Sequence, residues 1–251
     1  NTGPALSFVG NVKGYPVKIF LPAQLKSAYN SADRVRIARL YGAEVTPIDI
    51  NEFVDGADQL QGVERAASFV AIRMKQAYDL QQNDSSNWWA NQLCNVDNTK
   101  AHREFTGQEI LEQIDGKIDV WVASVGTGGT LLGVAQTLKE ANPELRIAGV
   151  VPTDDPRIEW VRSRAIHKAL ENFGGPKLRF LIEDILENNV MDKEITVENT
   201  DAKNMADRLC REEGLYCGMS SGANVLAAIE MAKSMDKGSK IVTLIVDRRD
   251  R

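Results

Sequence analysis

The feature that most constrains the fold is a buried strand that runs into a glycine-rich turn and then into a helix. The strand is expected at Val120–Ser124, the turn reads Gly126-Thr127-Gly128-Gly129-Thr130, and a helix is expected over Leu131–Ala141. Strands that alternate with helices in this way build parallel sheets, because parallel neighbours need a crossover connection. The sequence therefore predicts an α/β fold.

Short β-branched runs alternate with amphipathic helical stretches along the rest of the chain as well. The other strands are expected at Val17–Leu21, Glu44–Ile48, Arg146–Val151 and Ile241–Val246. The other helices are expected at Ala32–Tyr41, Glu64–Asp79, Gln108–Ile114, Ile158–Leu170, Ala202–Glu213 and Ala223–Met235. Thr130 and Asn199-Thr200 are the expected helix caps. The polar stretch 81–86 is interpreted as the passage between a small lobe, residues 1–80, and a larger lobe, residues 81–251.

The composition excludes several classes of protein. The formal net charge of −5 comes with interspersed Lys and Arg, so a nucleic-acid partner is not expected. No apolar run approaches the roughly 20 residues that cross a bilayer, so no membrane partner is expected either. The three cysteines match no metal motif, which favours free thiols in a reducing compartment and hence the cytoplasm. His102 and His167 are too isolated to suggest a metal site or a catalytic triad.

The glycine-rich turn is typical of an anion site. Glycines let backbone N–H groups approach an anion closely, and the helix N-terminus adds about half a positive charge. The hydroxyls of Thr127 and Thr130 can donate further hydrogen bonds. A nucleotide-hydrolysing loop would need a lysine after Gly129, and a dinucleotide fingerprint would need glycine in place of Leu131. A glycine-rich turn without a ligand remains the alternative.

Other motifs lie in order along the chain: Asn1-Thr2-Gly3, then Gln92 with Asn95-Val96-Asp97-Asn98, then 102–110, and finally Gly218-Met219-Ser220-Ser221-Gly222-Ala223. Together with the turn at 126–130 they resemble the substrate loop, the glutamine–asparagine stretch, the Thr-Gly-x-Glu-Ile helix start, the phosphate loop and the Ser-Ser-Gly turn of one family. This is the cysteine synthase and cystathionine β-synthase family of fold type II pyridoxal 5'-phosphate (PLP) enzymes. The resemblance extends over nearly the whole chain.

The resemblance implies a two-lobed fold like that of the tryptophan synthase β subunit, with largely parallel sheets flanked by helices, and PLP as the cofactor. It assigns the cofactor's ring oxygen to Asn1, its phosphate to Gly126, Thr127, Gly128, Gly129 and Thr130, and its pyridine nitrogen to Ser220. It assigns the substrate carboxylate to Thr2, Gly3 and Gln92. The implied partners are a small amino-acid substrate, sulfide or a thiol, and a second copy of the chain in a homodimer.

The implied activity is β-replacement that forms L-cysteine from an activated serine, O-acetylserine or O-phosphoserine, and sulfide. Two alternatives remain: a cystathionine β-synthase-like activity, and a module that binds PLP or an amino acid without catalysis. The family's cofactor-linked lysine lies upstream of its Asn-Thr-Gly loop, and none of Lys13, Lys18 or Lys26 has a matching context. We therefore expect that lysine upstream of Asn1, assign no catalytic residue within the chain, and expect these 251 residues not to catalyse the reaction alone.

Several motif residues also have a purely structural interpretation. Asn1 and Thr2 suit the cap of a helix over Ala5–Val12, Gln92 suits an exposed surface, and Ser220 suits an ordinary helix start. The chain also departs from the family pattern. The stretch 95–98 lacks the family's proline, 178–184 replaces a Gly-Ile-Gly segment, and 247–250 carries charges where small residues are common. The sequence therefore leaves the leaving group and the thiol acceptor open.

Overall fold

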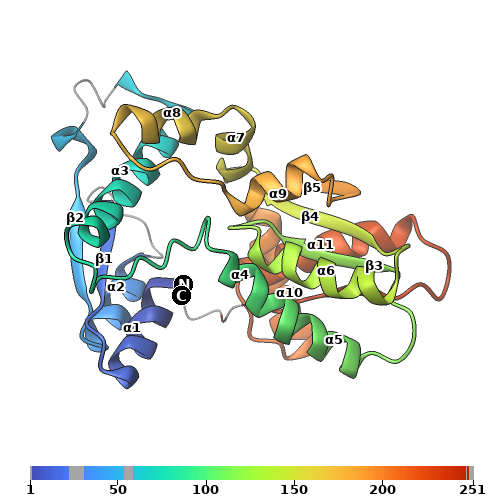
Figure 1. Ribbon diagram of the computed structural model, residues 1–251. Coiled ribbons are helices and arrows are strands. Elements are labelled where there is room, and N and C mark those ends of the chain that lie inside the picture. The colour runs from blue at the N-terminus through green and yellow to red at the C-terminus, as the bar shows by residue number, and fades with distance from the viewer. Residues whose placement is uncertain (1, 23–30, 54–58, 247, 249–251) are drawn as a thin grey trace. The chain divides into compact units, whose positions relative to one another are not determined.

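The computed structural model describes residues 2–22, 31–53, 59–246 and 248 (Figure 1). The chain forms two compact units. The first comprises Asn1–Asn91 with Glu159–Leu178, and the second comprises Gln92–Ile158 with Arg179–Asp250. Each unit is formed by more than one stretch of the sequence, because helix α8 (Ala165–Asn172) packs against α3 (Gly62–Asn83) in the first unit.

The first unit contains a two-stranded parallel sheet of β1 (Lys18–Pro22) and β2 (Glu44–Ile48). Its remaining elements are α1 (Thr2–Lys13), α2 (Ser31–Leu40), the 3-10 helix η2 (Ile50–Glu52), α3 and α8. Buried aliphatic side chains of β2, η2 and α3 form its core with aromatic neighbours from β1, α3 and the end of α8: Ile48, Ile50, Ile72, Phe20, Phe69 and Phe173. Helix α7 (Arg157–Arg162) begins in the second unit and ends in the first.

The second unit is built on a four-stranded parallel sheet in the order β5-β4-β3-β6. The strands are β3 (Val120–Ser124), β4 (Arg146–Pro152), β5 (Lys193–Val197) and β6 (Ile241–Thr243). The helices are α4 (Val96–Ala101), the π-helix η4 (His102–Thr106), α5 (Gly107–Gln113), α6 (Gly129–Ala141), α9 (Leu181–Glu187), α10 (Asn199–Glu213) and α11 (Met219–Lys233).

Strand β3 is central to this sheet, and its residues 120–122 are fully buried. A parallel strand covered on both faces reads as a continuous apolar run, as this one does. Helices α6 and α11 both pack on β3, and α11 also packs on α10 (Figure 1). The expected α/β fold with parallel sheets flanked by helices is therefore confirmed.

Several expectations about individual elements need correction. The structure contains a strand, β5, that the sequence analysis does not predict. This strand is short, lies at the sheet edge and buries only Ile195 and Val197. The single helix expected over Ile158–Leu170 is two helices, because Arg164 adopts a left-handed conformation with φ of 58° between α7 and α8. The last strand ends at Thr243 instead of Val246.

The helix caps also differ from those expected. Gly128 is the N-cap of α6, so Thr130 lies inside the first helical turn. Glu198 precedes α10, which begins at Asn199. Among the described residues, no helix is long and apolar enough to span a membrane.

The packing of α10 on α11 depends on a glycine. A Cβ atom built on Gly222 would lie 2.0 Å from the backbone oxygen of Ala202 and 2.8 Å from the backbone nitrogen of Ala206. Both atoms belong to the α10 backbone and cannot rotate away.

We therefore expect Gly222→Ala to lower the free energy of unfolding by about 1–3 kcal/mol, although alanine favours an isolated helix by about 1 kcal/mol. Urea denaturation measures the change, and Lys233→Ala, at an exposed position of α11, should stay within about 0.5 kcal/mol of the parent. A Gly222→Ala variant as stable as the parent would contradict this account of the packing.

Candidate functional site

The turn after β3 needs its glycines for steric reasons. Gly128 has φ of 92°, which L side chains rarely adopt, and a Cβ there would lie 2.8 Å from Cδ1 of Ile185. A Cβ on Gly129 would lie 2.3 Å from Oδ1 of Asn98. The turn leads straight into α6, whose first N–H groups have no intrahelical acceptor. The close packing of the turn therefore requires glycine at both positions.

The turn forms one wall of a pocket of about 170 Å³ within the second unit. Residues from the end of β3, from the turn, from α11 and from the segment after β6 line it: Ala123, Ser124, Gly126, Thr127, Gly128, Thr130, Ser220, Asn224 and Val246. Ser220 and Asn224 are four residues apart on α11 and so share one helical face. The structure therefore brings the predicted phosphate turn and Ser220 to one pocket. Gly129 is buried and does not line it.

The hydroxyl group of Thr127 accepts two hydrogen bonds. The Nδ2 atom of Asn98 donates at 2.9 Å, and the backbone N–H of Gly129 donates at 3.3 Å. A hydroxyl group has two acceptor positions and one donor, so the proton of Thr127 is left to donate to a third group. The second proton of Asn98 Nδ2 goes to the backbone oxygen of Gln92 at 2.8 Å.

The hydroxyl group of Thr130 is held by His102. The Nε2 atom of His102 lies 3.0 Å from Oγ1 of Thr130, and its Nδ1 lies 3.0 Å from Oγ1 of Thr106. His102 is half-buried on the π-helix, and this burial lowers its pKa below the ordinary value. This shift favours the neutral form of the ring at physiological pH. Sequence reasoning assigns His102 no role in the site, because its contact with Thr130 spans 28 residues.

An arginine also lies beside the turn. A Cβ on Gly126 would be 3.0 Å from Nη1 of Arg157, so the guanidinium group covers this glycine. Nε of Arg157 donates to both carboxylate oxygens of Asp155 at 2.8 Å, and the two side chains also form an ion pair. The pair therefore places the positive charge of Arg157 next to the turn, and the carboxylate of Asp155 neutralises this charge. Sequence reasoning does not find Arg157.

The pocket wall contains a buried acceptor. Asn224 is fully buried, and its Nδ2 donates to the backbone oxygen of Leu244 at 3.1 Å, which fixes the orientation of the amide. Its Oδ1 has no hydrogen-bond partner among the residues that the structure describes. A buried polar atom without a partner is costly, so Oδ1 indicates a donor supplied by a bound group or by water.

The residues assigned to the substrate carboxylate occupy different units. Thr2 and Gly3 lie in the first turn of α1, and the carbonyl of Gly3 accepts from Ser7 Oγ at 2.8 Å. Gln92 belongs to the second unit and its side chain is exposed. Asn1, assigned to the cofactor's ring oxygen, lies outside the described residues.

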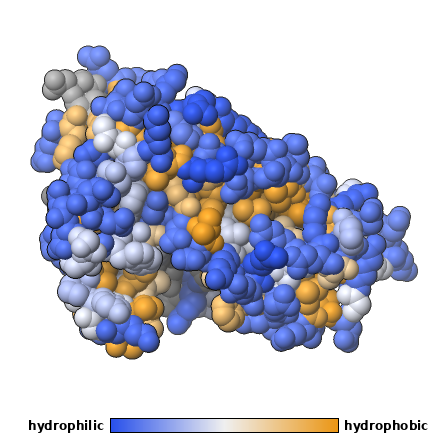
Figure 2. Space-filling view, viewed as in Figure 1, coloured by the Kyte–Doolittle hydropathy of each residue, from blue (hydrophilic) through white to orange (hydrophobic). Residues whose placement is uncertain are grey.

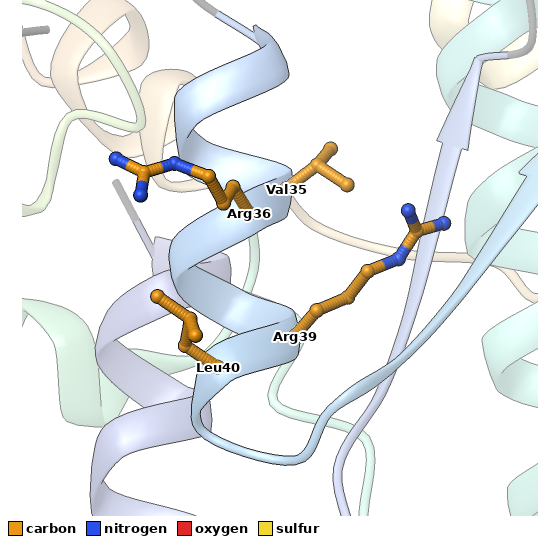
Figure 3. A pocket seen from close by; sticks show the side chains of 4 residues that line it. All are labelled: Val35, Arg36, Arg39 and Leu40. Carbon is orange, nitrogen blue, oxygen red and sulfur yellow. The ribbon is translucent and has the colours of Figure 1, made fainter.

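A second hollow, beside α2 in the first unit, is lined by Val35, Arg36, Arg39 and Leu40. Figure 3 shows that all four side chains come from one helix and that the two guanidinium groups point to different sides of it. Leu40 is 73% exposed. A ligand site needs polar groups that converge, so this hollow is not a candidate.

A parallel α/β unit with a glycine-rich turn and threonine hydroxyls at a helix start is typical of proteins that hold a phosphorylated cofactor. The chain belongs to the family described as pyridoxal-phosphate dependent enzymes, whose model matches residues 1–247. The expected family, its PLP cofactor and its enzymatic nature are thereby confirmed.

The chain is similar to several characterised proteins. It is 31% identical to cysteine synthase B of Pseudomonas aeruginosa over 251 residues, which cover 100% of this chain and 72% of that protein. It is 32% identical to cystathionine beta-synthase of Mus musculus, covering 98% of this chain but 41% of that protein. The structure of a hydrogen sulfide-producing enzyme from Fusobacterium nucleatum superimposes with a TM-score of 0.73 at 29% identity, covering 99% and 75% of the two chains.

The lowered pKa of His102 predicts how stability depends on pH. As the pH falls below about 6.5, the unfolded chain takes up this proton more readily than the folded chain, so the free energy of unfolding falls. The charged neighbours Lys100 and Arg103 are paired with Glu104 and Glu140.

We therefore expect His102→Gln to lose less stability than the parent between about pH 7.5 and 5.5, because glutamine does not titrate. Urea denaturation of both proteins at the two pH values measures the difference. An identical pH dependence of the two proteins would show that His102 has the same pKa in the folded and the unfolded chain.

Proposed function

We propose that this protein catalyses a PLP-dependent β-replacement that forms L-cysteine from an activated serine, O-acetylserine or O-phosphoserine, and sulfide. The observation that carries the proposal is the pocket of the second unit, which the turn at 126–130 and Ser220 line together. The similarity to a cysteine synthase and to a hydrogen sulfide-producing enzyme supports this chemistry.

The described residues fit the cofactor's phosphate. The glycines let the turn's backbone approach an anion, Thr127 has a hydroxyl proton left to donate, and α6 begins at the turn. When bound, PLP supplies an electron-withdrawing ring that eases departure of the β-substituent from the substrate. The neutral hydroxyl of Ser220 would hydrogen-bond the ring nitrogen without adding a charge, and Asn1 would bind the ring oxygen.

The resemblance assigns the substrate carboxylate to Thr2, Gly3 and Gln92, and we propose the same role for these residues here. The side chain of Gln92 is exposed, and its amide can donate to a carboxylate oxygen. The hydroxyl of Thr2 can do the same. The resemblance places the cofactor-linked lysine upstream of Asn1, so tests of activity and of ligand binding require the complete protein.

A cystathionine β-synthase-like activity is the second candidate, favoured by the 32% identity to the mouse enzyme. It uses the same first half-reaction and a bulkier thiol. We favour sulfide as the acceptor, because the chain is also similar to a cysteine synthase and to a hydrogen sulfide-producing enzyme.

We also propose a homodimer located in the cytoplasm. Helix α1 leaves Phe8, Val9 and Val12 between 49% and 66% exposed, and Figure 2 shows hydrophobic surface in this region. No disulfide joins cysteines among the described residues, which suits a reducing compartment. Light scattering of the complete protein at micromolar concentration should give twice the chain mass; a monomer would contradict the dimer.

Fluorescence microscopy of a tagged protein should show it in the cytoplasm, and an extracytoplasmic signal would contradict this location.

The activity itself is tested with purified, PLP-loaded protein. We expect cysteine from sulfide with O-acetylserine or O-phosphoserine, and a lower kcat/KM when homocysteine replaces sulfide. Chromatographic detection of the products measures both reactions. Bound PLP without turnover of either activated serine would favour the binding module instead.

The two assigned subsites should separate by mutation. Gln92→Ala should weaken amino-acid binding while PLP stays bound, because Gln92 would contact only the substrate. Thr130→Ala should lower PLP affinity first, since a hydrogen bond to a charged oxygen contributes about 1.5–3 kcal/mol, or roughly ten- to a hundredfold. Titrations with PLP and with substrate decide this, and equal loss of both ligands in Gln92→Ala would show a structural role for that residue.

A further inference from the structure

We propose that Asn98 and His102 are positioning residues that orient the hydroxyl groups of Thr127 and Thr130, so that both threonines donate their protons to the cofactor's phosphate. This inference rests on the proposed binding of PLP in the pocket of the second unit. It identifies residues outside the glycine-rich turn as determinants of phosphate affinity. Neither Asn98 nor His102 lines the pocket, so both would act through the threonines.

The direction of the hydrogen bond from Asn98 to Thr127 is fixed by a third group. The same Nδ2 atom lies 2.8 Å from the backbone oxygen of Gln92, which can only accept. An inverted amide would place two oxygen atoms at this distance, so Nδ2 is the donor in both contacts. With Gly129 N–H as the second donor at 3.3 Å, both acceptor positions of Thr127 are used and its proton is left for the pocket.

The ring of His102 can direct Thr130 in the same way. The hydroxyl of Thr106 lies 3.0 Å from Nδ1 and can donate to it, which leaves the ring proton of a neutral histidine on Nε2. Nε2–H then donates to Oγ1 of Thr130 at 3.0 Å, and the Thr130 proton is left for a ligand. The opposite tautomer would make Thr130 donate to the ring. A dianion in the pocket favours the first arrangement, because it requires donors.

Close helix packing places both residues against the turn. A Cβ on Gly133 would lie 2.3 Å from the backbone oxygen of Thr99 and 2.8 Å from Cβ of His102, so α6 can approach α4 and η4 only with glycine there. Thr137 Oγ1, one turn further along α6, donates to the backbone oxygen of Arg103 at 2.7 Å. Asn98 and His102 are four residues apart and so face α6 together. The π-helix η4, which begins at His102, is a conformation often found near functional sites.

The consequence is a specific preference for the phosphorylated form of the cofactor. If Asn98 and His102 act only through the two threonines, removing their donors should weaken the binding of PLP and leave the binding of pyridoxal, which lacks the phosphate, unchanged. A role in folding alone would weaken both ligands alike.

The test compares equilibrium titrations of PLP and of pyridoxal on the complete protein. In Asn98→Asp a carboxylate replaces the donor, and because a carboxylate can only accept, the proton of Thr127 turns toward it and away from the ligand. We expect PLP affinity to fall about tenfold or more, with pyridoxal affinity within about twofold of the parent. Asn95→Asp is the matched control, because it introduces the same charge at the N-cap of α4 and keeps the capping acceptor for the N–H of Asp97.

For His102, the variants are His102→Leu, which has no donor, and His102→Gln, whose amide can donate to Thr130. We expect about a tenfold loss of PLP affinity in His102→Leu and a smaller loss in His102→Gln, again without a change for pyridoxal. An unchanged ratio of the two affinities in Asn98→Asp and His102→Leu, or an equal loss of both ligands, would overturn the inference. A parent protein that binds PLP no better than pyridoxal would instead contradict the proposed function.

Discussion

The site depends on one packing constraint, the close approach of helix α6 to the segment formed by α4 and η4. Gly129 and Gly133 permit it, because a Cβ on either would lie 2.3 Å from a neighbouring oxygen atom. This contact fixes the beginning of α6 and with it the glycine-rich turn. It also brings the side chains of Asn98 and His102 within hydrogen-bond distance of the two hydroxyl groups of the turn.

The resulting anion site needs no cation within the turn itself. The donors that we propose for it are backbone N–H groups, threonine hydroxyls and the first turn of a helix. The nearby guanidinium of Arg157 is paired with Asp155 and therefore adds little net charge. We propose that a site of this kind holds a phosphate by geometry. Ser220 and Asn224 on α11 line the same pocket.

Much of the second unit could be predicted from the sequence. Strand β3, the turn and α6 are contiguous, so the local pattern of apolar residues and glycines is enough to find them. Ser220 came from the resemblance to known enzymes, and the structure places it on the same pocket. The family, fold class and cofactor followed from the same motifs and are confirmed.

The rest of the site depends on contacts between distant parts of the chain. Asn98 and Thr127 are 29 residues apart, and no local pattern shows that an asparagine side chain will donate to that hydroxyl. The unpaired acceptor of Asn224 depends on the orientation that Leu244 imposes. The sequence does not predict strand β5, because a short edge strand has only a weak alternation of apolar residues. It does not predict the break at Arg164 either, because a single left-handed residue leaves the helical pattern almost unchanged.

The most direct test of the central claim, that this turn binds the phosphate of PLP, is 31P NMR of the PLP-loaded protein as a function of pH. A free phosphate monoester changes its charge near pH 6. We predict a single bound resonance whose chemical shift stays constant between about pH 5 and 8, because the donors of the turn favour the dianion. A resonance that titrates like that of free PLP would show a phosphate exposed to solvent and would contradict the claim.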